Sequence, residues 1–246
     1  AKSVSNADWL MNHIYRGEYF CGFCSRMMNS LEDYLFDSSQ DIGKRRPQAI
    51  ETLFDALLVS GMAMTIVGTS APASGGEHLL SHTLDMMAGV DGLGHDLHGR
   101  QVGVGTILAS ALYERIFKID RPRCVDMPSN IDAFWGRLAG SVGEQYAQKK
   151  PQLAVLREKL NDQKIWQNFI ESARRQVRPP QQIKNCLKTA GAAHTFSELK
   201  CSRQRFRDAV LRMHQIRRRP TVVDLAWLLG VLPAAADEII NEWLSK

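Results

Sequence analysis

The chain has 246 residues, of which 44% are hydrophobic and 23% are charged. This composition predicts a packed globular core and excludes global disorder, and the length allows one large domain or two of ordinary size. The net charge of +5 is a mild positive excess. It is compatible with anionic substrates or nucleic acid as partners but does not by itself indicate either. No uninterrupted apolar run approaches the roughly 20 residues of a membrane span, so we expect no membrane partner.

The N-terminus, AKSVSNADWL, has neither a hydrophobic signal segment nor an initiating Met, and we therefore expect the sequence to be part of something longer. The five cysteines are odd in number and irregularly spaced, which argues against a disulfide framework and favours a reducing cytoplasm. Cys21 and Cys24 have the C-x-x-C spacing of a zinc or redox pair. No second such pair or matching histidine pair follows, so the spacing alone does not favour that role.

The first clear helical period begins at Pro47, a residue tolerated in the first turn of a helix. From Ile50 to Met62 apolar residues recur at steps of three and four. The segment QVGVGTIL resembles a strand, but the residues after it, ASALYERIF, continue the helical period. We predict a buried helix there with glycines at its contacts, and interhelical loops at Gly68 to Gly76 and at Gly89 to Gly94.

The composition shifts after Arg121-Pro122-Arg123 towards arginine, lysine, glutamine and amphipathic segments. Further helices are predicted at Ile165 to Val177, Phe206 to Met213, Asp224 to Leu229 and Ala235 to Leu244. Alternating strands bounded by turn residues are nearly absent. We therefore predict an all-α fold, with a helical domain at 1–125 and a helical extension at 126–246 that packs on it.

The residues with the clearest chemistry are three histidines. His78 and His82 are four apart and would lie on one face of a helix, and His98 opens the next predicted helix 20 residues after His78. Imidazoles brought together by helix packing suit a divalent transition metal such as zinc, nickel or iron. Isolated helical histidines are more commonly surface or satisfied core residues, so the spacing alone leaves both interpretations open.

The segment from SGMAM through SAPASGGEHLLSH to HGRQVGVGTIL resembles the glycerol-1-phosphate dehydrogenases, within the iron-containing alcohol dehydrogenase and dehydroquinate synthase superfamily. The opening AKSVSNADWL resembles the segment just after that family's metal-binding aspartate, and the resemblance extends to about Ile119. It implies a helical domain that holds a metal beside a separate N-terminal α/β domain that binds NAD(P)H. The implied reaction interconverts dihydroxyacetone phosphate and sn-glycerol 1-phosphate.

Residue roles follow from this resemblance. His78 and His98 match the two metal-binding histidines, and His82 matches a histidine in the cleft that serves catalysis by relaying a proton. Ser74 and Gly75, together with Arg100, are the candidate substrate contacts.

The sequence also departs from the family pattern. The family's third metal ligand, an aspartate, would precede this sequence, so the two histidines predict a weak metal site. No G-x-G-x-x-G in a strand–turn–helix context is present, so NAD(P)H would be bound by a domain absent from this chain. Relatives often have a basic or polar residue at position 71 that could meet the substrate phosphate. Ala71 cannot do so, and Arg100 is a replacement cation if it is not simply a solvated helix residue.

Two other polar features have plain structural interpretations. Asp8 could substitute for the missing carboxylate ligand, but we favour a helix N-cap or a surface residue. The run Arg217-Arg218-Arg219 follows four other arginines without the interleaved aromatic residues of a nucleic-acid stacking platform. We expect it to be a solvated surface near a subunit or domain contact, and we expect no nucleic-acid partner.

Three hypotheses follow. The first is the metal- and substrate-binding half of a glycerol-phosphate-type dehydrogenase, acting on a small polyol phosphate and compatible with a homodimer. The second is half of a dehydroquinate-synthase-like cyclase, and the third is a non-catalytic all-α module for binding or dimerisation. The loop SAPASGGEH followed by HGRQVGVGTIL favours the dehydrogenase. The chain by itself is expected to be inactive.

Overall fold

A computed structural model describes residues 2–128 and 133–245, and every regular element in these ranges is helical. The all-α prediction is confirmed. The α-helices are α1 (Lys2–Arg16), α2 (Gly22–Asp37), α3 (Ser39–Gly43), α4 (Pro47–Val67), α5 (Gly76–Asp91), α6 (His98–Ile116), α7 (Ala139–Leu160), α8 (Gln163–Arg174), α9 (Pro180–Thr189), α10 (Arg203–Arg212), α11 (Val222–Leu228) and α12 (Ala236–Ile239). Short 3-10 turns lie at Ala133–Leu138, Ser197–Leu199 and Met213–Gln215, and a π turn lies at Ile240–Leu244.

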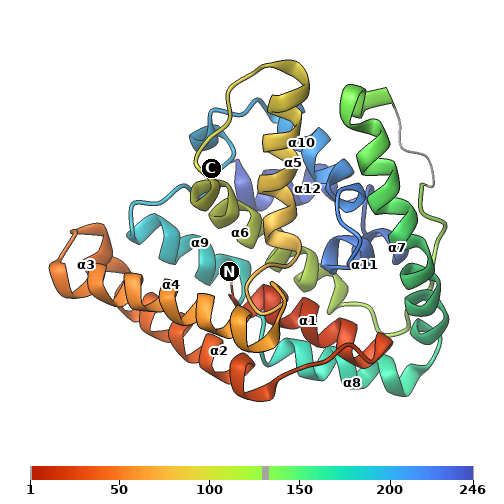
Figure 1. Cartoon of the computed structure of the whole chain (residues 1–246), viewed down its shortest axis with the longest axis horizontal. Helices are drawn as coiled ribbons and strands as arrows, with labels where there is room; N and C mark the ends of the chain where they lie inside the picture. The colour runs from red at the N-terminus through yellow and green to blue at the C-terminus, as the bar shows by residue number, and fades with distance from the viewer. Residues whose placement is uncertain (1, 129–132, 246) are drawn as a thin grey trace.

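Helices α5 and α6 pack against each other near the middle of the molecule (Figure 1). Helix α1 contacts both of them and also lies along α8, while α9 and α11 contact α6 from the later part of the chain. Helices α2, α3 and α4, drawn in orange, extend towards the left edge of the view. The central pair of helices is therefore in contact with both the N-terminal and the C-terminal parts of the chain.

One large hydrophobic core contains buried residues from α1 and from α5 to α12. It includes Leu80 of α5 and Leu112 of α6 together with Phe169, Phe206 and Ile239 from α8, α10 and α12. A smaller cluster, formed by Trp9, Cys24, Met28, Ala63 and Ala71, holds α2 and α4 against α1. The division at residue 125 stays a prediction.

The segment QVGVGTIL lies within α6, as predicted, and Gly105 explains its glycine content. A Cβ on Gly105 would lie 2.2 Å from the carbonyl oxygen of Glu77, so only glycine allows α5 and α6 to approach this closely. Helix α5 runs to Asp91, three residues into the predicted loop, and ends at Gly92, whose φ of 73° is in the left-handed region. The loop between α5 and α6 therefore spans residues 92–97, three residues later than the predicted Gly89 to Gly94.

The predicted helices of the C-terminal part are confirmed with small differences. Helix α8 ends at Arg174, ahead of the two prolines, and Pro180 occupies the first turn of α9. The segment from Ala235 to Leu244 is helical but changes from α12 to the π turn at Ile240.

Helix α4 exposes an apolar face to solvent. It packs on its neighbours through a stripe of small residues, Ala49, Ala56, Ser60 and Ala63. Its larger apolar side chains face solvent, among them Ile50, Phe54, Leu57, Leu58, Met62 and Ile66, with exposed fractions from 43% to 63%. With 21 residues and a mean hydropathy of 1.6, α4 is long and apolar enough to cross a membrane by length and composition alone. The expectation of no membrane partner rested on uninterrupted apolar runs, and Glu51 and Asp55 interrupt the apolar residues of α4.

Candidate metal centre and adjoining cavity

Helix α5 presents four polar side chains on one face, because residues three, four and seven apart are neighbours on a helix surface. They are His78, Ser81, His82 and Asp85. Helix α6 begins at His98, after the loop that follows α5, so its first residue lies beside this face.

The structure brings the three predicted histidines together. The ring centroids of His78 and His98 are 5.3 Å apart, those of His82 and His98 are 5.5 Å apart, and those of His78 and His82 are 6.2 Å apart. A metal ion lies about 2 Å from each imidazole nitrogen that binds it, so rings that share one ion have centroids only a few ångströms apart. The three rings have this spacing.

A hydrogen-bond chain orients the ring of His98. The hydroxyl of Ser81 donates to Oε1 of Gln101 over 2.6 Å, so its oxygen is free to accept from Nδ1 of His98, 2.8 Å away. This places the ring proton of a neutral His98 on Nδ1 and leaves Nε2 with a free lone pair. Partners of this kind orient metal-binding histidines and fix their tautomer. Sequence reasoning missed Ser81 and Gln101.

His78 has an equivalent partner in Glu77. Nδ1 of His78 is 2.7 Å from Oε1 of Glu77, which also accepts from the backbone N–H of Gly75 over 2.9 Å. Burial alone would raise the pKa of Glu77, but the hydrogen bond and charge of His78 and the Gly75 N–H hold it below its ordinary value. The buried carboxylate therefore accepts from Nδ1 and again leaves Nε2 of the ring free.

Asp85 supplies a carboxylate beside the histidines and was not among the predicted site residues. One potential ligand atom from each of His82, Asp85 and His98 lies within 4.8 Å of the others. Asp85 could have been predicted from its spacing. It lies three residues after His82 and seven after His78, which places it on the same face of the helix. The group that lies this close contains His82 and not His78, and its carboxylate is a second kind of donor beside the imidazoles.

This donor set fits a divalent transition metal. Metal-binding histidines must be neutral, and burial together with neighbouring positive charge lowers the pKa of both His82 and His98. Imidazole nitrogens with a nearby carboxylate are suitable ligands for zinc, nickel or iron.

The structure contradicts the interpretation of Asp8 as an N-cap or surface residue. Asp8 is fully buried within α1. Its carboxyl group accepts from the backbone N–H of Gly76 at 2.6 Å and of Val222 at 2.7 Å, and from the Tyr113 hydroxyl at 2.6 Å. Burial, reinforced by the charge of Glu77, raises the pKa of Asp8 to about 7. Asp8 therefore satisfies the first N–H groups of α5 and α11 instead of capping its own helix.

The candidate substrate contacts lie in different surroundings. Ser74 and Gly75 are in the loop that leads into α5, directly before the histidines. Arg100 is in the first turn of α6, where its guanidinium donates to the carboxylate of Asp96 and to the backbone carbonyl of Glu198.

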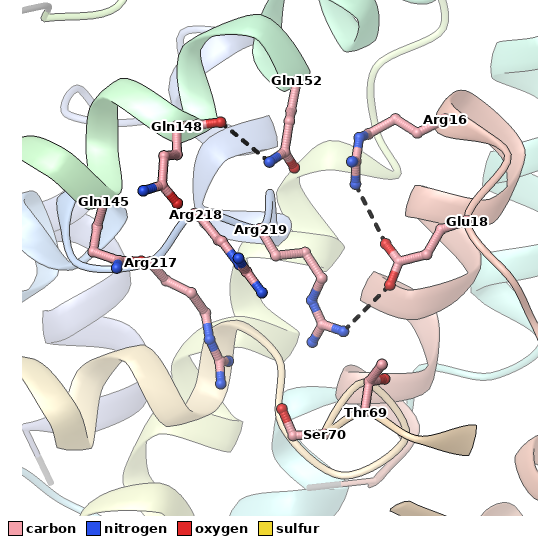
Figure 2. Close-up of a pocket in the computed structure, with 10 residues that line it drawn as sticks. All are labelled: Arg16, Glu18, Thr69, Ser70, Gln145, Gln148, Gln152, Arg217, Arg218 and Arg219. Atoms are coloured by element: carbon pink, nitrogen blue, oxygen red, sulfur yellow. Dashed lines mark hydrogen bonds and ion pairs between the residues drawn. The ribbon is translucent and has the colours of Figure 1, made fainter. Parts of the chain in front are cut away.

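A basic cavity is lined by Thr69 and Ser70 of the loop before α5 and by the run Arg217-Arg218-Arg219 (Figure 2). Arg217 donates to the Ser74 hydroxyl over 3.0 Å, and Arg219 donates to the Ser74 carbonyl. Both arginines line a cavity of about 570 Å³, and only Arg218 of the three is largely exposed. The expectation of a solvated arginine surface is therefore wrong for Arg217 and Arg219, because the segment after α10 folds back against the loop before α5.

Comparison with known proteins identifies relatives of the chain. No protein-family model matches it. A glycerol-1-phosphate dehydrogenase [NAD(P)+] from Bacillus licheniformis is 28% identical over 232 residues, which are 94% of this chain and 48% of that protein. The protein of the same name from Halalkalibacterium halodurans is 41% identical over 113 residues, or 46% of this chain and 28% of the relative. The chain is a homologue of the glycerol-1-phosphate dehydrogenases.

A further glycerol-1-phosphate dehydrogenase [NAD(P)+], from Geobacillus stearothermophilus, is 37% identical over 139 residues, or 56% of this chain and 34% of that protein. The resemblance inferred from the histidine motifs is thereby confirmed. The chain spans about half the length of the Bacillus licheniformis relative and a smaller share of the other two.

Proposed function

We propose that this chain supplies the metal- and substrate-binding half of an NAD(P)-dependent dehydrogenase that interconverts dihydroxyacetone phosphate and sn-glycerol 1-phosphate. The main support is the convergence of three imidazoles, from the consecutive helices α5 and α6, in a homologue of glycerol-1-phosphate dehydrogenases. The relatives' names favour a dehydrogenase over a dehydroquinate-synthase-like cyclase.

In this proposal His78 and His98 hold the metal through Nε2, because both have a partner at Nδ1 that fixes this tautomer. Asp85 lies close enough to His98 to contribute a carboxylate oxygen. A divalent zinc, nickel or iron ion bound there would act as a Lewis acid towards the substrate carbonyl.

His82 has a different role in the proposal. Among the residues that the structure describes, its ring has no hydrogen-bond partner, in contrast to the rings of His78 and His98. Burial, the charge of Arg217 and the two neighbouring imidazoles lower its pKa, which keeps the ring neutral and able to accept a proton near pH 7. We assign His82 to proton transfer, and Ser74 and Gly75, with Arg100 as a weaker candidate, to substrate contacts.

NAD(P)H would be held by a domain outside the described residues. Residues 2–128 and 133–245 contain no strand, and hence no strand–turn–helix site for a dinucleotide. The proposal keeps 1–125 as the metal- and substrate-binding domain and 126–246 as its extension, and it allows a homodimer. It also places the protein in the cytoplasm, since all five cysteines are free thiols.

The metal assignment is tested by zinc titration of the purified chain in a calorimeter. His78→Ala and His98→Ala should abolish binding, whereas His82→Ala should leave it nearly unchanged. Equal loss of zinc binding in all three variants would show that the ligand and proton-transfer roles are assigned wrongly, and no binding by the unaltered chain would contradict the proposed metal centre.

The catalytic assignment is tested by turnover of dihydroxyacetone phosphate with NADH and NADPH. The chain alone should be inactive, because holding the nicotinamide against the carbonyl can account for roughly 7–11 kcal/mol of barrier. Fusion to the nucleotide-binding part of the Bacillus licheniformis enzyme should restore turnover, and His82→Ala should lower it about a hundredfold in the fusion. Robust turnover by the chain alone would contradict the proposal that NAD(P)H is bound by a separate domain.

A further inference from the structure

The basic cavity beside Ser74 has an unusual charge balance. Its lining contains four guanidinium groups, those of Arg16, Arg217, Arg218 and Arg219, and one carboxylate, that of Glu18 (Figure 2). These groups come from the end of α1 and from the segment between α10 and α11, and they are directed towards the same space.

Internal ion pairs leave much of this positive charge unbalanced. Glu18 is shared, since one oxygen is 3.3 Å from Arg16 and the other is 3.7 Å from Arg219. Arg217 donates to Ser74, which is uncharged. Arg218 makes no hydrogen bond or ion pair with any residue that the structure describes. Like charges gathered around one cavity raise its potential and attract an anion.

One donor in the lining lacks an acceptor. Nε of Arg219 is buried and has no hydrogen-bond partner among the described residues, although the same guanidinium donates to Ser74 and pairs with Glu18. A buried donor without an acceptor costs free energy, and an anionic oxygen would remove that cost. Guanidinium groups present several N–H donors in a fork that matches the oxygens of a phosphate.

The rest of the lining is neutral and polar. Gln145, Gln148 and Gln152 of α7 lie three and four residues apart, so their amides share one face of the helix above the arginines (Figure 2). Thr69 and Ser70 supply hydroxyls from the loop after α4. Amides and hydroxyls both donate and accept hydrogen bonds, as the hydroxyl groups of a polyol require.

The cavity is linked to the candidate metal centre through Ser74. The loop that Arg217 and Arg219 hold lies four residues before His78. The positive charge of Arg217 also contributes to lowering the pKa of His82, so the guanidinium and this imidazole are electrostatic neighbours. A small ligand that spans both places would have one end among the arginines and the other beside the histidines.

We propose that this cavity binds the phosphate of the polyol phosphate substrate, with Arg217, Arg218 and Arg219 as its contacts and the α7 amides facing hydroxyl groups. This assignment rests on the proposed function. The same chemistry would also suit the pyrophosphate of a dinucleotide, so the test includes both. Arg100, the cation suggested by the sequence, is already bonded to Asp96 and Glu198.

The test is calorimetric titration of the 246-residue chain at low ionic strength with sn-glycerol 1-phosphate, inorganic phosphate, glycerol and NADH. The two small phosphates should bind, and glycerol and NADH should not. Arg218→Gln should weaken glycerol phosphate binding about tenfold, the loss of one charge-assisted hydrogen bond. Because Arg218 is exposed and unpaired, this change should not affect folding. Arg175→Gln is the matched control, since Arg175 follows α8 and does not line the cavity.

Zinc titration of the same variants separates this inference from the proposed function. Zinc binding without phosphate binding, or equal phosphate binding by the Arg218→Gln and Arg175→Gln variants, would overturn the cavity assignment alone. Binding of NADH in place of glycerol phosphate, lost in Arg218→Gln, would also overturn it, because the cavity would then serve the cofactor. Absence of zinc binding by the unaltered chain would instead contradict the proposed metal centre.

Discussion

His214 is a buried imidazole far from the candidate metal centre in sequence. Its ring centroid is 4.9 Å from that of Trp227 and 5.7 Å from that of Tyr146, and its backbone carbonyl accepts from the buried ammonium of Lys149. Burial, together with the charge of Lys149, lowers the pKa of His214 to about 3. The folded protein therefore keeps this ring neutral at pH values where an unfolded chain would protonate it.

This difference predicts a pH dependence of stability. The unfolded chain binds a proton at His214 below about pH 6.5 and the folded chain does not, so the free energy of unfolding falls as the pH drops from about 6.5 towards 3. One such group contributes up to about 1.4 kcal/mol per pH unit. Urea unfolding between pH 7 and 4 should show a shallower dependence for His214→Leu than for the unaltered chain. Parallel profiles would contradict the prediction.

At the scale of single residues, the sequence predicted that His78, His82 and His98 lie close together, because their spacing places them near the starts of two consecutive helices. It did not predict the roles of Asp8 or Arg217, since their partners Val222 and Ser74 are distant in the sequence. Burial of a charged side chain depends on such partners, and periodicity contains no information about them. Asp85 was within reach of sequence reasoning because it continues the face of α5.

The close approach of α5 and α6 predicts opposite effects for two glycines of α6. Gly105→Ala places a Cβ 2.2 Å from the Glu77 carbonyl oxygen, so the helices must separate. We expect a loss of about 1–3 kcal/mol of unfolding free energy and weaker zinc binding. Gly99→Ala meets no heavy atom within 4 Å and should stabilise the helix by about 0.5–1 kcal/mol. Urea unfolding and zinc titration measure both, and equal effects would contradict the packing argument.

Helix α4 predicts a similar contrast between its two faces. Phe54→Gln with Leu57→Gln alters exposed side chains and should change the free energy of unfolding by less than about 1 kcal/mol while reducing binding of a hydrophobic dye. Ala63→Leu adds volume to the buried stripe and should cost about 1–3 kcal/mol. A large loss of stability in the double variant would show that the apolar face is covered in solution. The helical period predicted α4 but not which face is buried, because both faces are apolar.

On the scale of the whole molecule, Asp8 connects parts of the chain that are more than 200 residues apart. Asp8→Ala leaves the N–H groups of Gly76 and Val222 and the hydroxyl of Tyr113 without their acceptor, and should cost about 4 kcal/mol of unfolding free energy. Tyr113→Phe removes a single donor and should cost about 1 kcal/mol. Thermal and urea unfolding measure both values. A smaller loss for Asp8→Ala than for Tyr113→Phe would show that Asp8 is not the shared acceptor.

The helical class and the positions of α4, α5, α6, α8, α10, α11 and α12 were predictable, because amphipathic periods are local properties of the sequence. The positions of α1, α2, α3, α7 and α9 were not predicted. The cavity was not predictable, because Arg16, Ser70, Gln148 and Arg218 reach it from four separate elements. Only the packing of the end of α1, the loop before α5, α7 and the segment after α10 brings their side chains together. The same packing mixes both halves of the chain in one core, which composition alone did not indicate.

The placement of Ser74 at the entrance to α5 has a thermodynamic consequence. Arg217 and Arg219 hydrogen-bond to Ser74 in the loop before α5. His78, the first of the three histidines, follows Ser74 by four residues, about one helical turn. If the cavity binds an anion as proposed, the anion would compete with Ser74 for Arg217, and this would change the free energy of arranging His78 for a metal ion. Heterotropic linkage of this kind is reciprocal: whatever factor phosphate applies to zinc affinity, zinc must apply to phosphate affinity. Inorganic phosphate and zinc would then each change the affinity of the other without contacting the other's binding groups.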